Sequence, residues 1–279
     1  MLDIIIDVVV DCLKILPFLF LTYLAIEIIE EKAEEKTVEL VNRSGKLGPV
    51  IGGALGVIPQ CGFSAATSNL YASGIITRGT LIAVFLSTSD EMLPILISRS
   101  VPVSFIIKVL VYKMLCGIAA GMLIDFVERK LGRKNDRTIH EMCEQEGCKC
   151  EDGILKSALR HTIKIFLFLL AVTFIVSVAV EFVGTERISG FILNKPVIGE
   201  LLAGLIGLIP NCAASVVITE LYLQGGMTAG AMLSGLLVGS GVGLLVLFRM
   251  DRKRKDCFIT LGLLYLSGVL LGIAGNLLF

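Results

Sequence analysis

Two matching tetrapeptides each place an amide and a thiol directly after a proline. Ile58-Pro59-Gln60-Cys61 returns 151 residues later as Ile209-Pro210-Asn211-Cys212. Thiolates suit zinc, Cu(I) and other thiophilic metals, whereas amide oxygens suit harder ions. A cysteine in an apolar segment is more often only a small apolar residue, but its repetition at two helix breaks favours a functional site. If helices restart at Ser64 and Ser215, their N-termini would instead favour an anion.

Two adjacent carboxylates, Asp90-Glu91, lie in the middle of an apolar segment. A carboxylate at bilayer depth costs about 2.5–3.5 kcal/mol, so such a pair indicates function. Pro94 cannot donate to the carbonyl of Asp90, and we therefore expect the helix to open there. Carboxylates, freed carbonyls and hydroxyls such as that of Ser89 suit a hard cation. The plainer alternative is that either acid only pairs with Lys113 in the next segment.

The second half of the chain lacks this acidic pair, because Asp90-Glu91 aligns with Gly241-Val242. The predicted substrate site is therefore asymmetric, with charge from one half and flexible backbone from the other. Glu220, which aligns with Asn69, is either a further ligand or structural. The predicted substrate-binding residues are Gln60, Cys61, Asn69, Ser89, Asp90, Glu91, Asn211, Cys212 and Glu220. Metal ligands among them are Asp90, Glu91, Cys61 and Cys212, and the helix-breaking residues are Pro59, Gly62, Pro94 and Pro210.

A second set of metal-binding residue types lies in the hydrophilic middle of the chain. His140, Cys143, Cys148 and Cys150 have the spacing H-x2-C-x4-C-x-C, which matches no standard zinc finger. They could hold a thiophilic metal loosely, or they could be incidental thiols in a polar linker. We expect these thiols to be reduced and cytoplasmic.

The composition requires a membrane environment for most of the chain. Of the 279 residues, 55% are hydrophobic and 18% are charged, and the mean hydropathy is +0.85. A soluble domain of this length needs more polar surface. The formal net charge is zero, and nothing indicates nucleic-acid binding. Asp3 and Asp7 replace the basic start of a cleavable signal peptide, so none is expected.

Apolar segments follow the same plan in each half, which we divide as residues 1–127, a cytoplasmic loop 128–156, and residues 157–279. The expected segments are Ile4–Ile29, Gly48–Ile58, Ser64–Ser73, Gly79–Ile97 and Pro102–Val127, then Ser157–Val183, Val197–Ile209, Ala213–Leu223, Met227–Phe248 and Phe258–Phe279. A charged stretch, Glu30–Lys46, predicts an interfacial helix. The short pairs either span the membrane or form re-entrant hairpins, since a span needs about 20 residues.

The count per half is five or three, and both are odd, so the halves should sit upside down relative to each other. Most basic residues fall in one set of loops, which the positive-inside rule assigns to the cytoplasm. Both termini are then extracytoplasmic. Gly117 and Gly121, which align with Gly268 and Gly272, have the small-residue spacing of closely packed membrane helices.

The repeated Ile-Pro-x-Cys breaks, the run Ser87-Thr88-Ser89-Asp90-Glu91-Met92 and the five-plus-five layout resemble the ten-helix heavy-metal exporter family. Members of that family are labelled arsenic efflux proteins or manganese transporters. The chain is also distantly similar to arsenic permeases with a cysteine-containing helix break. The resemblance covers nearly the whole chain except the central loop. It implies efflux of a metal or metalloid, with Pro59, Gln60, Cys61, Asp90, Glu91, Pro210, Asn211 and Cys212 as the core.

The sequence thus predicts an all-α integral membrane protein with two inverted-topology repeats whose broken or re-entrant helices meet at the midplane. We expect an inner-membrane secondary transporter that exports a divalent or thiophilic metal ion in exchange for protons or sodium. Its expected partners are membrane lipid and, in a homo-oligomer, further copies of the chain. The first alternative is transport of arsenite, an organoarsenical or a similar anionic or neutral species at half-helix N-termini. An intramembrane enzyme is disfavoured, because His140 and His161 lie at or beyond the cytoplasmic boundary. No phosphate-binding loop appears, and no cofactor is expected.

Overall fold

The computed structural model describes residues 47–58, 61–89, 92–132, 154–183, 195–251 and 253–279, with separate residues between 8 and 24. Most of the first predicted span, the whole of Glu30–Lys46 and the 140–150 loop lie outside these residues. So do Pro59, Gln60, Asp90 and Glu91, and the side chains of Cys61 and Cys212.

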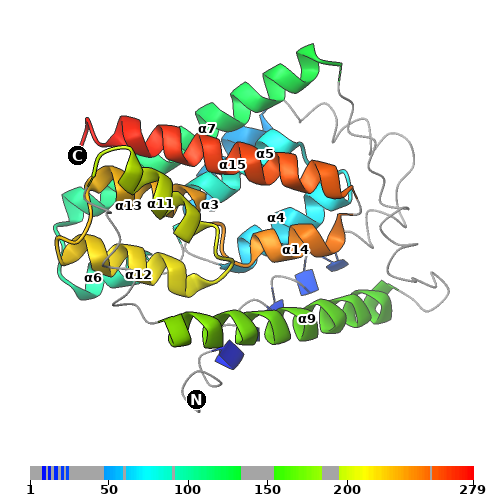
Figure 1. The fold of residues 1–279 in the computed structure, drawn as a ribbon. Coiled ribbons are helices and arrows are strands. Elements are labelled where there is room, and N and C mark those ends of the chain that lie inside the picture. The colour runs from blue at the N-terminus through cyan, green and yellow to red at the C-terminus, as the bar shows by residue number, and fades with distance from the viewer. Residues whose placement is uncertain are drawn as a thin grey trace.

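Every regular element in the described part of the chain is a helix (Figure 1). The first half contains α3 (Gly48–Gly56), α4 (Cys61–Ala72), α5 (Arg78–Ser87), α6 (Met92–Ser98) and α7 (Val103–Lys130). After α9 (Ile154–Val183) come α11 (Ile198–Gly207), α12 (Cys212–Leu223), α13 (Ala229–Val238), α14 (Gly243–Met250) and α15 (Arg254–Gly275). At the repeat offset of 151 residues, α4 and α5 have the same bounds as α12 and α13.

The turns that join these matched helices are also alike. Gly74 and Gly225 follow α4 and α12 with φ of 79° and 75°, a conformation that favours glycine. Thr77 and Thr228 then cap α5 and α13, because each hydroxyl accepts a hydrogen bond from the backbone N–H three residues later. The same local chemistry therefore begins the central helix of each half.

Helices α5 and α13 form the core. Every residue of α5 is buried, and so is every residue of α13 after the first. Such all-round burial fits their apolar composition. Helix α5 packs between α3 and α7, and α13 packs between α11 and α15. The halves also exchange contacts, since α4 packs on α14 and α12 packs on α6.

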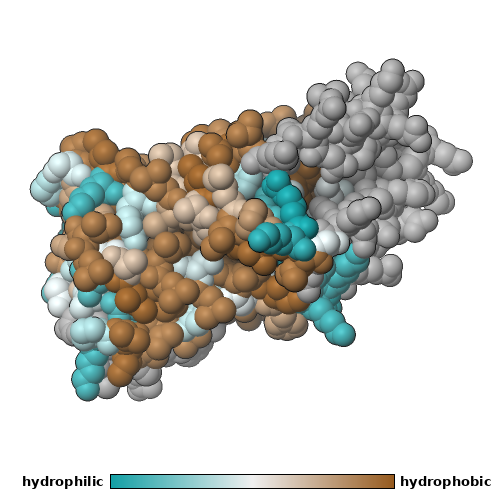
Figure 2. All heavy atoms as spheres, turned by 90° about the horizontal axis from the view of Figure 1, so that it is seen from above, coloured by the Kyte–Doolittle hydropathy of each residue, from teal (hydrophilic) through white to brown (hydrophobic). Residues whose placement is uncertain are grey.

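The repeated glycines pack helices together, which confirms the predicted role. An added Cβ at Gly117 would lie 2.6 Å from the carbonyl oxygen of Ala83, and one at Gly272 would lie 2.5 Å from Cβ of Ser234. The outer helices α7 and α15 turn large apolar side chains outward, including Leu123 and Leu270. Apolar side chains cover the middle of the face in Figure 2, and polar ones gather toward its ends.

Five stretches of the described residues are long and apolar enough to cross a membrane: 78–98, 103–130, 158–175, 229–250 and 254–275. The fourth corrects the continuous span expected at Met227–Phe248, whereas an opening of the first near Asp90 was expected. Each contains two helices, α5 with α6 and α13 with α14, separated at 88–91 and 239–242. Pro94 and the run Gly239-Ser240-Gly241 account for breaks at these places.

Candidate functional site

A cavity of about 10 Å³ lies where helix breaks of both halves meet. It is lined by Thr88, Ser89 and Met92 at the α5–α6 break, Lys113 on α7, Gly207, Asn211, Ala214 and Ser215 at the α11–α12 break, and Gly235, Leu236, Gly239 and Gly241 at the α13–α14 break. A cavity of this size holds about one water-sized particle. It therefore has room for a single ion in this conformation.

Helix ends of both kinds converge on the cavity. Helices α5, α11 and α13 end there with their C-terminal carbonyl groups, while α6, α12 and α14 begin there with their N-terminal N–H groups. Carbonyl ends favour cations and N–H ends favour anions. The backbone alone could thus bind a cation or an anion, and the side chains determine which of the two is preferred.

Lys113 supplies a buried positive charge to this place. Its side chain is 1% exposed, and Nζ donates hydrogen bonds to the carbonyl oxygens of Thr88 at 2.5 Å and Leu236 at 2.6 Å. These carbonyls belong to the C-terminal ends of α5 and α13, so the ammonium group connects the two halves. Burial of a charge is costly unless it is bonded in this way.

The aligned serines Ser89 and Ser240 occupy the two central breaks but bond differently. Ser89 Oγ donates to the carbonyl oxygen of Val57 at 2.6 Å and so ties its break to the end of α3. Ser240 is fully buried, and its Oγ has no hydrogen-bond partner among the described residues. The repeat aligns the two residues, but only Ser89 was predicted from the sequence as a site residue.

Several predicted site residues are at or beside the cavity. Ser89 and Asn211 line it. Asp90 and Glu91, which stand between Ser89 and Met92 in the sequence, lie outside the described residues. Cys61 and Cys212 are the first residues of α4 and α12. The helices therefore restart there and not at Ser64 and Ser215, the starts on which the anion alternative depended.

Two predicted helix-breaking residues lie inside helices. Gly62 is in the first turn of α4, and Pro94 is in the first turn of α6. A proline is tolerated in a first turn because the N–H groups there have no partner within the helix. The α5–α6 break consequently lies before Pro94, while Pro210 stands in the α11–α12 break as predicted.

Asn69 and Glu220 are not brought to the cavity, which corrects their placement with the other site residues. Asn69 Oδ1 accepts a hydrogen bond from the Tyr23 hydroxyl at 3.3 Å. Glu220 makes a bidentate contact with Arg99, whose Nη2 lies 2.9 Å from both carboxylate oxygens. Residues this far along a helix stand about 12 Å beyond its start, because each residue advances 1.5 Å. The repeat alignment correctly matched Asn69 with Glu220, but it did not predict how far these residues lie from the cavity.

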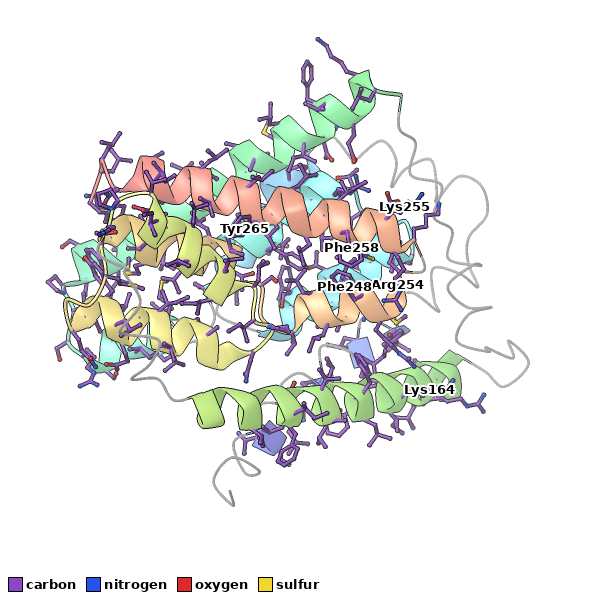
Figure 3. The ribbon with its side chains drawn as sticks, in the orientation of Figure 1. Lys164, Phe248, Arg254, Lys255, Phe258 and Tyr265 are labelled. Atoms are coloured by element: carbon purple, nitrogen blue, oxygen red, sulfur yellow. The ribbon has the colours of Figure 1, made fainter. Side chains whose placement is uncertain are left out.

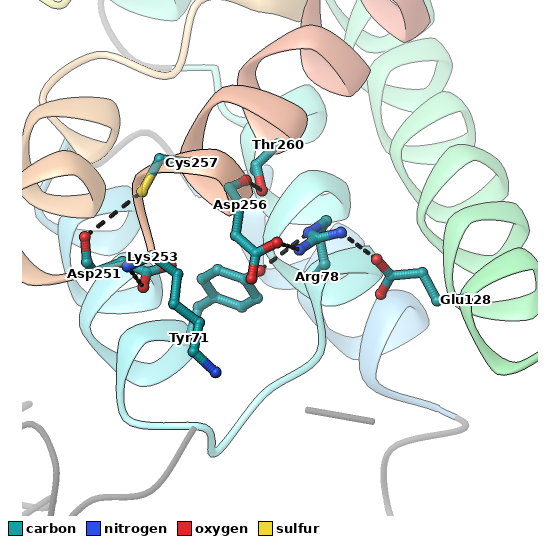
Figure 4. Close-up of polar contacts among 8 residues, drawn as sticks. All are labelled: Tyr71, Arg78, Glu128, Asp251, Lys253, Asp256, Cys257 and Thr260. Carbon is teal, nitrogen blue, oxygen red and sulfur yellow. Dashed lines mark hydrogen bonds and ion pairs between the residues drawn. The ribbon is translucent and has the colours of Figure 1, made fainter. Parts of the chain in front are cut away.

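The bond network around Arg78 joins the halves at one end of the bundle (Figure 4). Arg78 is 5% exposed, and its Nε donates to the hydroxyl of Tyr71 at 3.0 Å. Its other nitrogens pair with Glu128 at the end of α7 and with Asp256 at the start of α15, the latter at 3.2 Å. We call these four residues the Arg78 cluster. Sequence reasoning missed the cluster, although a basic residue at the head of an apolar segment was a usable signal.

At the opposite end of the bundle, the repeat counterparts of three residues of the Arg78 cluster are aromatic. Tyr222, Phe105 and Phe279 align with Tyr71, Asp256 and Glu128, and alanine replaces Arg78. The ring of Phe105 stacks on Tyr222 with centroids 5.9 Å apart and meets Phe279 edge-on at 5.7 Å. We call these three residues the aromatic cluster. One end is thus joined by a buried guanidinium, whereas at the other end aromatic contacts lie beside the Arg99–Glu220 ion pair and the ammonium group of Lys108, which is 4.2 Å from the ring centroid of Phe279.

The described residues contain no group of three His, Cys, Asp or Glu side chains placed to hold a metal ion. The predicted ligands Asp90, Glu91, Cys61 and Cys212 and the loop residues His140 to Cys150 are not among the side chains described. The described lining of the cavity provides oxygen atoms from Ser89, Asn211 and the backbone.

The family model described as "Putative, 10TM heavy-metal exporter" matches residues 1–185, which run from the N-terminus through α9. No curated protein and no solved structure matches the chain. The match covers more than half of the sequence, and the apolar helices agree with a multi-pass membrane protein. The chain belongs to this ten-helix heavy-metal exporter family.

Proposed function

We propose that the protein is a secondary active transporter that exports a divalent or thiophilic metal ion in exchange for protons or sodium. The observation that supports this most strongly is the meeting of helix breaks from both halves around one small cavity. In secondary transporters with internal repeats, broken helices near the bilayer midplane bind substrate and coupling ions. In this conformation the cavity has room for a single ion.

The proposed ligands combine carboxylates with backbone and amide oxygens. Asp90 and Glu91 follow Ser89 directly, and Asn211 lines the cavity. Their oxygens suit a hard divalent cation such as manganese. Cys61 and Cys212 would add soft ligands at the first residues of α4 and α12. Oxygen ligands outnumber thiols, so we expect manganese slightly ahead of zinc.

Transport of an anionic or neutral metalloid is the second candidate, and Lys113 is the observation that favours it. A buried ammonium group beside the N-terminus of α12 could attract an oxyanion. Purified protein in liposomes, assayed with manganese, zinc, arsenite and an organoarsenical, tests both candidates. We expect a metal cation to be transported. A response to arsenite or the organoarsenical alone, unaffected by changes at Asp90 and Glu91, would reject the cation.

We also propose that α3 with α4, and α11 with α12, form re-entrant hairpins. Helix α3 runs alongside α5, because an added Cβ at Gly52 would touch Val84. Helix α4 then returns to the Arg78 cluster through Tyr71. Helix α3 has nine residues and is about 13 Å long, less than half of the hydrocarbon core of about 30 Å. This leaves three spanning elements in each half.

The inverted arrangement of the halves has support from α15. Its start contacts the start of α5 through Asp256 and Arg78, and Asn276, directly after its end, contacts the start of α13 through Gly230. Helices α5 and α13 therefore begin at opposite ends of α15 and meet at Lys113. The basic residues Lys164, Arg254 and Lys255 gather at the end that holds the Arg78 cluster (Figure 3). We assign that end to the cytoplasm by the positive-inside rule.

The topology predicts which cysteines a membrane-impermeant thiol reagent can modify. In intact cells Cys148 and Cys150 should be protected, because the central loop is cytoplasmic, and they should react in inside-out vesicles. As a control, Leu278→Cys in a background without the loop cysteines should react in intact cells, since Leu278 is exposed near the opposite end. Ready modification of the loop cysteines in intact cells would disprove the orientation.

Replacement of Cys61 or Cys212 by serine separates thiolate ligation from oxygen ligation. If the thiols bind metal, each change should lower zinc transport by about tenfold or more and leave manganese transport within about threefold. If helix N-termini bind an anion through backbone N–H groups, both serines should be tolerated. The measurement is initial transport rate in liposomes, with metal-dependent thermal stabilisation as a second readout. Equal zinc rates in all three proteins would exclude thiol ligands.

A further inference from the structure

Glu200 is a buried acid that lies outside the proposed substrate site. It belongs to the first turn of α11, and 1% of its side chain is exposed. Its Oε1 lies 2.6 Å from the position that a Cβ on Gly230 would take, so the carboxylate stands at the N-terminus of α13. Its Oε2 has no hydrogen-bond partner among the described residues.

The first half provides a matched carboxylate, Asp125, whose oxygens are both bonded. Asp125 accepts hydrogen bonds from the N–H of Gly79 at 2.8 Å and from the hydroxyl of Thr77 at 2.7 Å. Its repeat counterpart is the neutral Asn276, which accepts from the N–H of Gly230 at 3.2 Å. Glu200 therefore brings to α13 the negative charge that Asp125 brings to α5.

A role in stabilising the helix dipole explains Asp125 but not the free oxygen of Glu200. An ionised carboxylate buried with an unbonded oxygen is costly, and addition of a proton to that oxygen removes the charge. A metal ion would need several oxygen ligands around it. The space beside Gly230 is already filled by Glu200 and Asn276. The chemistry of the site thus favours a proton.

The other titratable groups on the helices around α11 are bonded to other partners or lie away from Glu200. Helix α13 carries none. On α15 the hydroxyl of Tyr265 donates to the carbonyl oxygen of Leu201 at 3.1 Å, and Arg254 to Cys257 lie at the far end. On α12, Glu220 pairs with Arg99, and Tyr222 stacks on Phe105; Cys212 begins that helix. Tyr112 on α7, near Gly275, donates to the carbonyl oxygen of Leu271.

We propose that Glu200 is the binding site of the coupling proton, on the extracytoplasmic side of the substrate cavity. The proposal rests on the function proposed above and names its coupling ion. Binding adds one proton to Oε2 and converts the carboxylate to the neutral acid, with no other bond made or broken. Helix α13 connects this site to the cavity, because Ser234 donates to the carbonyl oxygen of Glu200 at 2.7 Å and the next residue, Gly235, lines the cavity.

The test measures manganese flux in liposomes with and without an opposing pH gradient, together with the pH of the lumen. We expect the gradient to accelerate wild-type flux by about tenfold, a typical coupling factor, and Glu200→Gln to lose that acceleration and the proton flux. Glu200→Asp should keep both. Asp125→Asn is the matched control, which should lose thermal stability but keep the acceleration. Protons released on manganese binding in weakly buffered detergent provide a second readout, with release reduced in Glu200→Gln even if this variant does not transport.

The outcomes separate this inference from the proposed function. If the wild type moves no metal, the proposed function is wrong. If it moves metal and Glu200→Gln keeps the acceleration and the proton release, Glu200 is not the coupling site. Equal loss of acceleration in Glu200→Gln and Asp125→Asn would show a structural role only and would overturn the proposal. Acceleration by a sodium gradient instead of a pH gradient would also overturn it.

Discussion

Arg78→Met should lower the free energy of unfolding by about 1.5–3 kcal/mol, because it removes the charged hydrogen bonds that the buried guanidinium makes to two partly buried carboxylates. Arg78 is almost fully buried and is bonded to Tyr71, Glu128 and Asp256. Two of these partners come from helices α7 and α15, so the change also removes a link between the halves. The measurement is denaturant or thermal unfolding of the purified protein in detergent, compared with the wild type.

Arg129→Met is the control for the loss of a cation at the same end of the bundle. Arg129 is 49% exposed and lies 3.8 Å from Asp125. Exposed ion pairs contribute about 0–1 kcal/mol, so this change should be nearly neutral. Equal stability losses in the two variants would contradict the importance of the Arg78 cluster.

Asp90→Asn and Glu91→Gln should each reduce metal transport by about a hundredfold or more while leaving the protein folded. Each change removes a charged oxygen ligand but lowers the cost of placing the segment in the membrane. Manganese transport in liposomes gives the effect, and size-exclusion chromatography with thermal unfolding checks the fold. Both positions lie outside the described residues, so the prediction depends on their place in the sequence beside Ser89.

Glu220→Gln is the matched control for these two changes. It also neutralises an acid in an apolar helix, but it breaks only the partly exposed pair with Arg99. Its transport rate should stay within about threefold of the wild type. Wild-type rates in both Asp90→Asn and Glu91→Gln would show that the acids are not ligands.

Local sequence signals predicted the helices and most of their ends. The alignment of Pro59 with Pro210 located one pair of breaks, because proline chemistry acts within a few residues. The break at Gly239 to Val242 was expected only as flexible backbone, and the helix separation there was not foreseen. A run of glycine and serine weakens a helix without deciding whether it stops.

Features that depend on contacts between the halves could not be predicted from the sequence. The Arg78 cluster requires α15 to reach α5, and no local pattern encodes that approach. Glu200 was passed over because it stands at the start of an apolar segment, where an acid is usually solvated. Only its burial against Gly230 makes it unusual. Asn69 and Glu220 were aligned correctly, but alignment does not tell how far a residue lies from a break.

The unlike clusters at the two ends have an energetic consequence. In a chain that repeated itself perfectly, opening one end would cost the same free energy as opening the other, and neither access state would be preferred. Separating the charges of the Arg78 cluster exposes groups that water solvates well. Separating Phe105, Tyr222 and Phe279 exposes apolar area, which costs about 25 cal/mol per Å². For the transport function proposed above, we therefore expect the resting state to keep the aromatic end shut.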